Sequence, residues 1–302
     1  MLRFFGSSSG LLVAELAMTG MGAVTLYCVE RTALTMRPRL EQEHAGALDR
    51  TLLIGGAAFM IGWEDLAVAY GHLDDALALL LLALATRALV AQLPGVAGIC
   101  LGLSVDAKPW ALIFLPLILV VPAQARRHTA LWTAITVVVA WLPFVLADPG
   151  TLTAAQFGIT NVPSSALRAL GVTTPTTPGW DRAAQILLGC VLGAVAVRRR
   201  RWPALVLLGV GARIALDPGV YGYYTAGVLL GALLWDLLGS RRPVPLWTLL
   251  CGATLAVAPA LTSDGALLGQ LRLWLVLSFT ITLLLLPARQ YGPITPAKAP
   301  AT

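Results

Sequence analysis

The sequence predicts an all-α fold, a polytopic bundle of transmembrane helices, and three observations indicate it. Of the 302 residues, 58% are hydrophobic and only 12% are charged, whereas a soluble domain carries about 25% charged residues. The mean hydropathy is +0.80. Apolar runs near the roughly 20 residues that one helical crossing needs recur as far as the C-terminal region. The chain is therefore expected to be an integral membrane protein with no soluble domain.

The apolar runs predict about ten or eleven spans within a single transmembrane domain, residues 1–290. Two of them, residues 51–63 and 95–106, are short for a full crossing. Short or re-entrant helices are tolerated where their backbone faces protein or a water-filled cavity. The N-terminal stretch lacks a small-x-small cleavage site and is expected to be a retained span. The predicted spans cover residues 10–29, 51–63, 76–93, 95–106, 110–123, 129–147, 183–197, 203–216, 221–238, 244–261 and 266–287.

Basic and acidic residues separate to opposite sides if these spans alternate. The basic clusters Arg126–Arg127, Arg198–Arg201 and Arg241–Arg242 share one side, which the positive-inside rule makes cytoplasmic. A short tail, residues 291–302, lies on that side too. The other side, external to the plasma membrane, receives nine of the fifteen acids: Glu64, Asp65, Asp74, Asp75, Asp106, Asp148, Asp181, Asp217 and Asp264.

This alternation places the N-terminus outside and gives an odd number of crossings. Two explanations are open: a span and its loop precede this sequence, or one short span is miscounted.

Several classes of protein are disfavoured by the same composition. The net charge of +6 comes from clusters between apolar runs, so membrane topology explains it better than nucleic-acid binding does. The four cysteines stand singly in apolar segments, so no zinc or redox motif is indicated. Nothing in the sequence requires a metal or another cofactor, and no nucleotide-binding fingerprint is present.

The longest polar segment, residues 148–182, is predicted to be an external loop rich in Thr, Pro, Gly and Ser. Its length exceeds what a connector needs, and such loops are usually functional or disordered. Within it, SSALRALGV suits a short helix lying along the membrane interface; a solvated connector is the alternative. Asp148 and Asp181, at the two ends of the loop, are expected to cap helices.

Acidic residues crowd around a histidine where one span starts. A capping role accounts for any single acid there, since helix starts favour negative charge. Four acids exceed what a cap needs, and a carboxylate beside a histidine suits general-base attack on a hydroxyl proton. We predict Asp74, Asp75 and His72 as catalytic residues, with Glu64 and Asp65 as second choices.

A lysine interrupts the next apolar stretch in the motif DAKPW. Lys108 either extends to the interface or pairs with Asp106, or it binds an anionic headgroup. Pro109 ends one helix and starts another, which leaves free backbone donors suited to phosphate. Trp110 is then an interfacial anchor or a stacking surface for a sugar or prenyl chain.

A second candidate phosphate ligand, Arg213, precedes a tyrosine-rich turn. Arg213 and Asp217 are spaced i,i+4, as in a structural ion pair; a phosphate contact is the alternative. Tyr221, Tyr223 and Tyr224 suit the aromatic belt of a membrane interface, or they line a lipid or sugar groove.

Together these motifs resemble a known family. The segments GHLDD, AGICLGLSVDAKPWALIFLPLIL, LPFVLADP and RIALDPGVYGYY resemble bacterial GT-C-fold membrane glycosyltransferases, in particular the glycosyltransferase family 87-like group, over residues 51–240. The resemblance implies transfer of a hexose, most often mannose, from a polyprenyl-phosphate donor to a hydroxyl of a glycan or glycolipid at the external leaflet. In that family an acid in the first external loop serves as base. If this sequence begins after that loop, the base of the family has no counterpart in it.

Two other functions fit the sequence. Broken helices and charges at membrane depth are also typical of transporters, so a flippase or transporter for a lipid-linked or small anionic substrate is one alternative. A truncated, non-catalytic relative is the other. The gathering of charge at one face, away from the midplane, favours the enzyme.

Overall fold

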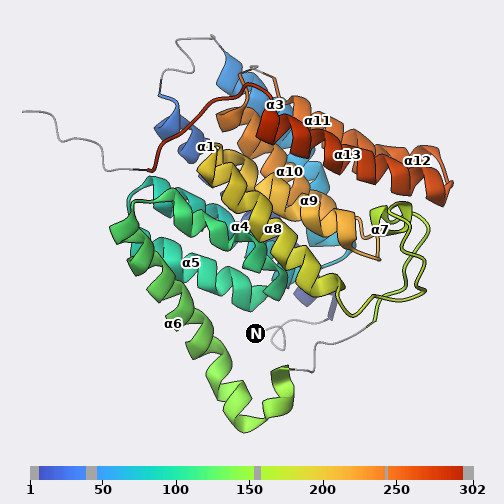
Figure 1. Ribbon diagram of the computed structural model, residues 1–302, viewed down its shortest axis with the longest axis horizontal. Helices are drawn as coiled ribbons and strands as arrows, with labels where there is room; N and C mark the ends of the chain where they lie inside the picture. The colour runs from blue at the N-terminus through green and yellow to red at the C-terminus, as the bar shows by residue number, and fades with distance from the viewer. Residues whose placement is uncertain (1–6, 39–45, 153–157, 242–243, 295–302) are drawn as a thin grey trace, which may run out of the picture.

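The computed structural model describes residues 7–38, 46–152, 158–241 and 244–294. Within these ranges the chain is helical, with one isolated β-bridge between Thr160 and Thr176 and no strand. The helices lie side by side, and α6 diverges from the others at the edge of the bundle (Figure 1). The predicted all-α class is confirmed.

The helices of the first half follow the predicted spans closely. They are α1 (Ser7–Met36), α3 (Ala47–Glu64), the π-helical turn η2 (Asp65–Ala69), α4 (Leu73–Val90), α5 (Pro94–Ala107), the 3₁₀ helix η3 (Pro109–Val120), α6 (Ala123–Ala147) and the 3₁₀ turn η4 (Pro149–Leu152).

The second half begins with the short helix α7 inside the polar segment. Its elements are α7 (Ala166–Ala169), α8 (Asp181–Arg198), η5 (Trp202–Ala204), α9 (Leu205–Leu216), α10 (Tyr224–Leu234), the π-helical turn η6 (Trp235–Gly239), α11 (Leu246–Gly252), the π-helical turn η7 (Ala253–Val257), α12 (Ala258–Leu261) and α13 (Gly265–Leu285).

Four helical stretches are long and apolar enough to cross a membrane: Gly10–Met36, Leu48–Ala69, Ala123–Ala147 and Gly265–Leu285. They identify the chain as a membrane protein. The second stretch corrects the sequence prediction, because residues 51–63 extend at both ends into a helix of 22 residues. Helix α5, by contrast, has 14 residues, as short as predicted.

The predicted span at 110–123 takes an unusual form. Residues Pro109–Val120 make a 3₁₀ helix, and prolines at 109 and 116 cannot donate the hydrogen bonds of a regular α-helix. Since a 3₁₀ helix rises about 2 Å per residue, twelve residues reach about 24 Å. The fully buried Phe114 shows that this segment lies in the core of the bundle.

Helices that run in alternate directions give the bundle two chemically different ends. At one end, two arginines donate to the last carbonyls of α13: Arg199 to Leu284 at 2.8 Å and Arg201 to Leu283 at 2.8 Å. Cations at helix C-termini are favoured by unpaired carbonyls and by the helix dipole. We call this end, which holds residues 126, 198–201 and 289–294, the arginine end.

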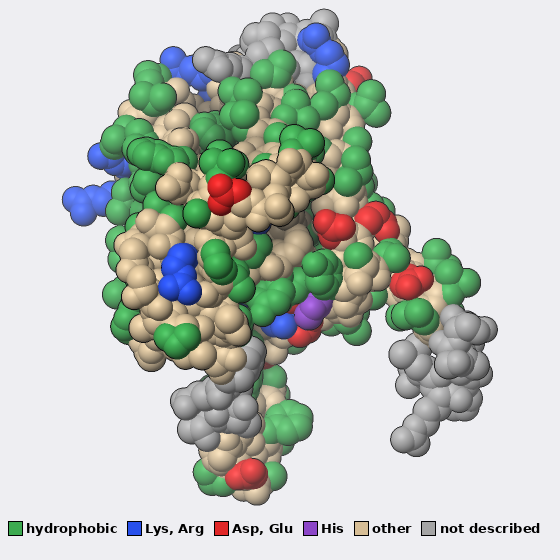
Figure 2. Space-filling model, turned by 90° about the vertical axis from the view of Figure 1, so that its right-hand side faces the viewer, with side chains coloured by type: hydrophobic (Ala, Val, Ile, Leu, Met, Phe, Trp, Pro, Cys, Tyr) green, Lys and Arg blue, Asp and Glu red, His purple; other side chains and the backbone are tan. Residues whose placement is uncertain are grey.

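The opposite end holds the starts of α4, α8 and α10 and the ends of α5 and α9. Figure 2 looks onto it: acidic side chains are spread over the face, and a histidine lies beside basic and acidic neighbours. We call this end the carboxylate end, residues 65–75, 106–110, 181–182 and 217–224. Of the nine acids predicted to share one side, six lie within these ranges: Asp65, Asp74, Asp75, Asp106, Asp181 and Asp217.

Around α7, the second described part of the long loop packs against the bundle. The short helix α7 begins at Ser165, whose hydroxyl accepts a hydrogen bond from the amide of Arg168 at 3.0 Å. Leu167 is fully buried, and Arg272 of α13 donates to the carbonyl of Ser164 at 2.8 Å. The short helix expected within SSALRALGV is therefore present and packed, whereas most of residues 171–180 are exposed; residues 153–157 of the loop lie outside the described ranges.

The C-terminal segment lies at the arginine end as far as it is described. The amide of Tyr291 donates to the carbonyl of Arg200 at 2.7 Å, and that of Ile294 to the carbonyl of Val120 at 3.0 Å. The rest of the predicted tail, residues 295–302, lies outside the described part of the chain.

Candidate functional site

The predicted catalytic residues lie where the chain turns from η2 into α4. Gly71 adopts φ +62°, a left-handed conformation that glycine takes without steric cost. His72 is then the N-cap of α4, and Asp74 and Asp75 occupy its first turn. Because α5 ends at Ala107 just before Pro109, Lys108 reaches the same place.

An ion cluster joins the two helix ends. The ammonium of Lys108 lies 2.6 Å from Oδ2 of Asp74 and 3.3 Å from Oδ2 of Asp75. Nδ1 of His72 lies 3.7 Å from a carboxylate oxygen of each. Lys108 thus pairs with these acids and not with Asp106, which corrects that sequence alternative.

The cluster compensates a buried carboxylate. Asp75 is only 3% exposed, and its Oδ1 accepts a hydrogen bond from the indole N–H of Trp110 at 2.9 Å. Burial lowers the pKa of Lys108, but its contacts with Asp74 and Asp75 raise it further, so that the pKa lies above the ordinary lysine value. Lys108 therefore keeps its charge. Burial would raise the pKa of Asp74, but the contact with Lys108 holds that pKa below the ordinary aspartate value.

Arg213 is held beside this cluster between two aromatic rings. Its guanidinium carbon lies 4.5 Å from the ring centre of Trp110 and 4.1 Å from that of Tyr224. The side chain is 10% exposed, and Nε lies 3.7 Å from Oδ2 of Asp217. Within the described chain the guanidinium donates no hydrogen bond, so a buried cation is left with free donors.

Asp217 links Arg213 to its surroundings. Its buried carboxylate accepts hydrogen bonds from the hydroxyl of Tyr224 at 3.1 Å and from the amide of Gly219 at 2.9 Å. Arg182 of α8 donates to it at 3.3 Å. The ion pair that the i,i+4 spacing predicts thus exists, within a wider network.

Two cavities adjoin these residues and meet at Tyr224. The inner cavity, of about 10 Å³, has room for about one water molecule. It is lined by Asp75, Leu79, Trp110, Val210, Arg213, Tyr223, Tyr224 and Gly227. The outer cavity, of about 310 Å³, is large enough for a sugar-sized ligand. It is lined by Asp65, Tyr70, Ile214, Gly219, Val220, Tyr221, Gly222, Tyr224, Thr225, Leu255, Ala256, Pro259 and Arg272.

Most of the residues predicted from the sequence come together at this end. The ring of Tyr223 lies 4.2 Å from that of His72 and 4.7 Å from that of Tyr224. The group that gathers around the inner cavity and the ion cluster is His72, Asp74, Asp75, Lys108, Trp110, Arg213, Tyr223 and Tyr224.

The two second choices, Asp65 and Glu64, lie apart from that group. Asp65 faces the outer cavity. Glu64 lines neither cavity, and its carboxylate accepts a hydrogen bond from the hydroxyl of Thr19 in α1 at 3.3 Å. Side chains at adjacent positions on a helix point in different directions, so Glu64 and Asp65 face different neighbours.

Sequence reasoning missed Arg272, which is 6% exposed and lines the outer cavity. A signal was present, because a charge inside an apolar span is costly and its default interpretation is functional. No pattern in the sequence shows that Arg272 would face the cavity to which Asp65 also belongs.

Three potential metal ligands lie within the ion cluster. His72, Asp74 and Asp75 each offer a ligand atom, and these atoms lie within 4.8 Å of one another. The ammonium of Lys108 already supplies positive charge there, at 2.6 and 3.3 Å from the two carboxylates. A metal ion at this point would compete with Lys108.

Asp181, at the loop end of α8 ahead of its apolar run, is expected to lower stability near neutral pH. Its side chain is fully buried, and Oδ2 accepts a hydrogen bond from Gln185 at 2.7 Å. Burial and the nearby Asp217 raise its pKa to about 6, against the opposing effect of Arg182. The folded state then binds the proton more tightly than the unfolded state, so stability falls as pH rises from about 4 to about 6.

Asp181→Asn is therefore expected to raise the free energy of unfolding at pH 7 by roughly 2 kcal/mol and to flatten this pH dependence. Thermal unfolding in detergent at pH 4.5 and pH 7 measures both. The exposed Asp148→Asn is the control and should change neither value. If the free energy of unfolding of Asp181→Asn still falls between pH 4.5 and pH 7, another group causes the pH dependence.

No protein-family model, no curated protein and no solved structure matches this chain. The resemblance to GT-C glycosyltransferases accordingly stays a prediction, as do the roles of the site residues. Any function proposed for this chain therefore rests on the geometry of the carboxylate end.

Proposed function

We propose that the carboxylate end is a transfer site for a lipid-linked hexose. The choice of mannose as that hexose rests on the family resemblance alone. The donor is a polyprenyl-phosphate sugar, and the acceptor is a hydroxyl of a glycan or glycolipid. The carboxylate end faces the outside of the plasma membrane and the arginine end faces the cytoplasm, as the positive-inside rule expects.

The proposal rests on the environment of Arg213. A buried guanidinium with free N–H donors lines the inner cavity, and arginine binds phosphate through paired donors. The rings of Trp110 and Tyr224, on either side, fix the plane of the Arg213 guanidinium group. Lys108 is the weaker phosphate ligand of the two, because Asp74 and Asp75 already neutralise it.

The carboxylates supply the base. Asp75 lines the same cavity as Arg213, and Asp74 and His72 stand next to it toward solvent. A carboxylate that accepts the acceptor's proton while a cation holds the leaving phosphate makes the two contributions that this chemistry needs.

The proposed reaction balances within these groups. The acceptor oxygen forms a bond to the anomeric carbon, and the bond from that carbon to the phosphate oxygen breaks. The hydroxyl proton passes to the carboxylate, and the electron pair leaves with the polyprenyl phosphate beside Arg213. No redox partner is required.

The cavities constrain how substrates enter. The inner cavity holds about one water, so Tyr223 or Tyr224 must move before a phosphate reaches Arg213. The outer cavity is sugar-sized and is bordered by the exposed, apolar Ala256 and Pro259. Those residues offer a lateral opening toward lipid that suits a polyprenyl chain.

Reconstitution tests the proposal directly. The protein is placed in liposomes with a polyprenyl-phosphate hexose labelled in the sugar and with a glycolipid acceptor, and labelled product is measured. Transfer that depends on protein supports the enzyme. Label that crosses the bilayer on the intact donor lipid would instead identify a flippase. If neither transfer nor crossing is detected, the result favours a non-catalytic relative.

A further inference from the structure

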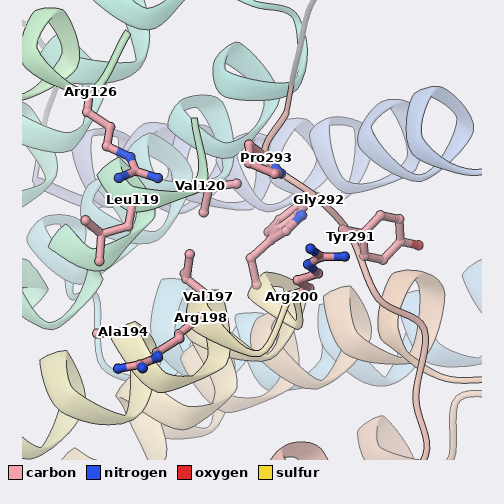
Figure 3. Close-up of a pocket in the computed structure, with 11 residues that line it drawn as sticks. Leu119, Val120, Arg126, Ala194, Val197, Arg198, Arg200, Tyr291, Gly292 and Pro293 are labelled. Carbon is pink, nitrogen blue, oxygen red and sulfur yellow. The ribbon is translucent and has the colours of Figure 1, made fainter. Parts of the chain in front are cut away.

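A pocket of about 360 Å³ lies at the arginine end, opposite the proposed transfer site. Arg126 reaches it from α6, and Arg198 and Arg200 reach it from the end of α8 (Figure 3). The C-terminal segment at Tyr291 closes another side (Figure 3). Three cations from two separate parts of the chain therefore share one cavity.

The positive charge of this pocket is not compensated within the described chain. None of its lining residues is acidic, and neither Arg126, Arg198 nor Arg200 forms an ion pair with a described carboxylate. Arg126 donates from Nε to the carbonyl of Val121 at 2.8 Å, which leaves its terminal nitrogens available. The indole N–H of Trp202, which lines the pocket and is 3% exposed, has no described partner either.

One of the three arginines occupies a costly backbone conformation. Arg200 has φ +60° at the end of α8. The amide of Arg200 donates to Val197, and that of Arg201 donates to Ala196. This is the Schellman arrangement, in which glycine is the usual residue at the left-handed position. An arginine placed there at a steric cost is typical of a residue kept for its side chain.

The surface next to the pocket is apolar. Leu187 and Val191, both exposed, lie on one face of α8 that continues through Ala194 to Arg198, because residues three or four apart share a helix face. Leu119 of η3 lines the pocket and is also exposed. A ligand in the pocket thus meets cations at one end and an exposed apolar stripe at the other.

We infer that this pocket binds the phosphate of an anionic phospholipid, with the acyl chains lying along the stripe on α8. Basic pockets between transmembrane helices on the positive side of a membrane protein bind such headgroups. The cavity volume fits a headgroup, and the apolar stripe favours a lipid over a soluble phosphate. This site is independent of the proposed transfer chemistry at the other end.

The test uses the full chain in nanodiscs of phosphatidylcholine, with or without phosphatidylglycerol. Native mass spectrometry counts retained phosphatidylglycerol, and the unfolding temperature is measured in parallel. Each arginine near an anionic headgroup contributes about fivefold in affinity, so Arg198→Gln with Arg200→Gly is expected to weaken retention about 25-fold. Arg200→Gly also removes the backbone cost, so the double variant should stay folded.

Two control variants separate the pocket from general effects. Arg127→Gln removes an exposed neighbouring charge that does not line the pocket. Gln92→Gly makes the same relief at the second non-glycine left-handed residue of the described chain, at φ +63°, which does not line the pocket. Both should retain phosphatidylglycerol as the unaltered protein does.

Equal loss in Arg127→Gln and in the double variant would overturn the inference, since any surface arginine would then suffice. In a further arm, inorganic phosphate is added to phosphatidylcholine nanodiscs. Stabilisation by inorganic phosphate equal to that by phosphatidylglycerol would overturn the lipid assignment and point to a soluble anion. Stabilisation by phosphatidylglycerol alone, lost in the double variant, supports it.

Discussion

Arg213→Gln is expected to lower kcat/KM for a lipid-linked hexose donor by about 100- to 1000-fold, the usual effect of removing one group that stabilises charge in a transition state. The charge on the phosphate grows as the glycosidic bond breaks, so the cation matters more in the transition state than in the bound donor. Both kcat and donor affinity should therefore fall. Steady-state kinetics in proteoliposomes, with donor binding measured separately, resolves the two.

Arg182→Gln is the matched control for this change. Arg182 pairs with the same carboxylate of Asp217, at 3.3 Å, but its side chain is 42% exposed and lines neither cavity. If Arg213 acted only by neutralising Asp217, the two variants would lose activity alike. Full activity in Arg182→Gln with loss in Arg213→Gln assigns the effect to the free donors of Arg213.

The sequence predicts the spans and their ends because apolar runs mark segments that lie in the bilayer core and polar residues mark where those segments stop. Alternating spans bring the start of α4 and the end of α5 to one end, so Asp74 and Lys108 could be expected near one another. The structure brings them to 2.6 Å. The same logic gathered the arginines at the other end, where Arg199 and Arg201 contact the last carbonyls of α13.

The rotation of each helix about its axis could not be predicted. A helix that is apolar all round has no polar stripe to mark its inward face, and lipid accepts apolar side chains as well as the core does. This is why Glu64 and Asp65, one residue apart, fall against α1 and the outer cavity respectively. It is also why Arg272 was not assigned to that cavity.

The division of the site into two cavities has a consequence for the chemistry. Asp75 shares the inner cavity with Arg213, whereas Asp65 shares the outer cavity with Arg272. Each cavity therefore pairs one carboxylate with one buried arginine. The outer cavity is large enough for a sugar, and the inner cavity contains Arg213 with its free donors. Substituting Asp75 and Asp65 in turn therefore tests which carboxylate takes the proton.

Asp75→Asn is expected to lower kcat by about 100- to 10,000-fold, the range that a positioned general base contributes. Asparagine keeps an oxygen that can accept the indole N–H of Trp110, now 2.9 Å from Oδ1 of Asp75, but it cannot take a proton at neutral pH. Donor binding should persist, because Arg213 and Lys108 remain. Single-turnover transfer and a donor-binding assay on the same preparation measure both quantities.

Asp65→Asn is the comparison that makes this result decisive. It makes the same chemical change in the outer cavity and should leave the rate of the chemical step nearly intact, since Asp65 stands apart from Arg213 and Lys108. The reverse pattern, with transfer lost in Asp65→Asn and kept in Asp75→Asn, would move the base to the outer cavity. Arg272 would then replace Arg213 as the phosphate ligand, because the leaving group and the base must flank the same anomeric carbon.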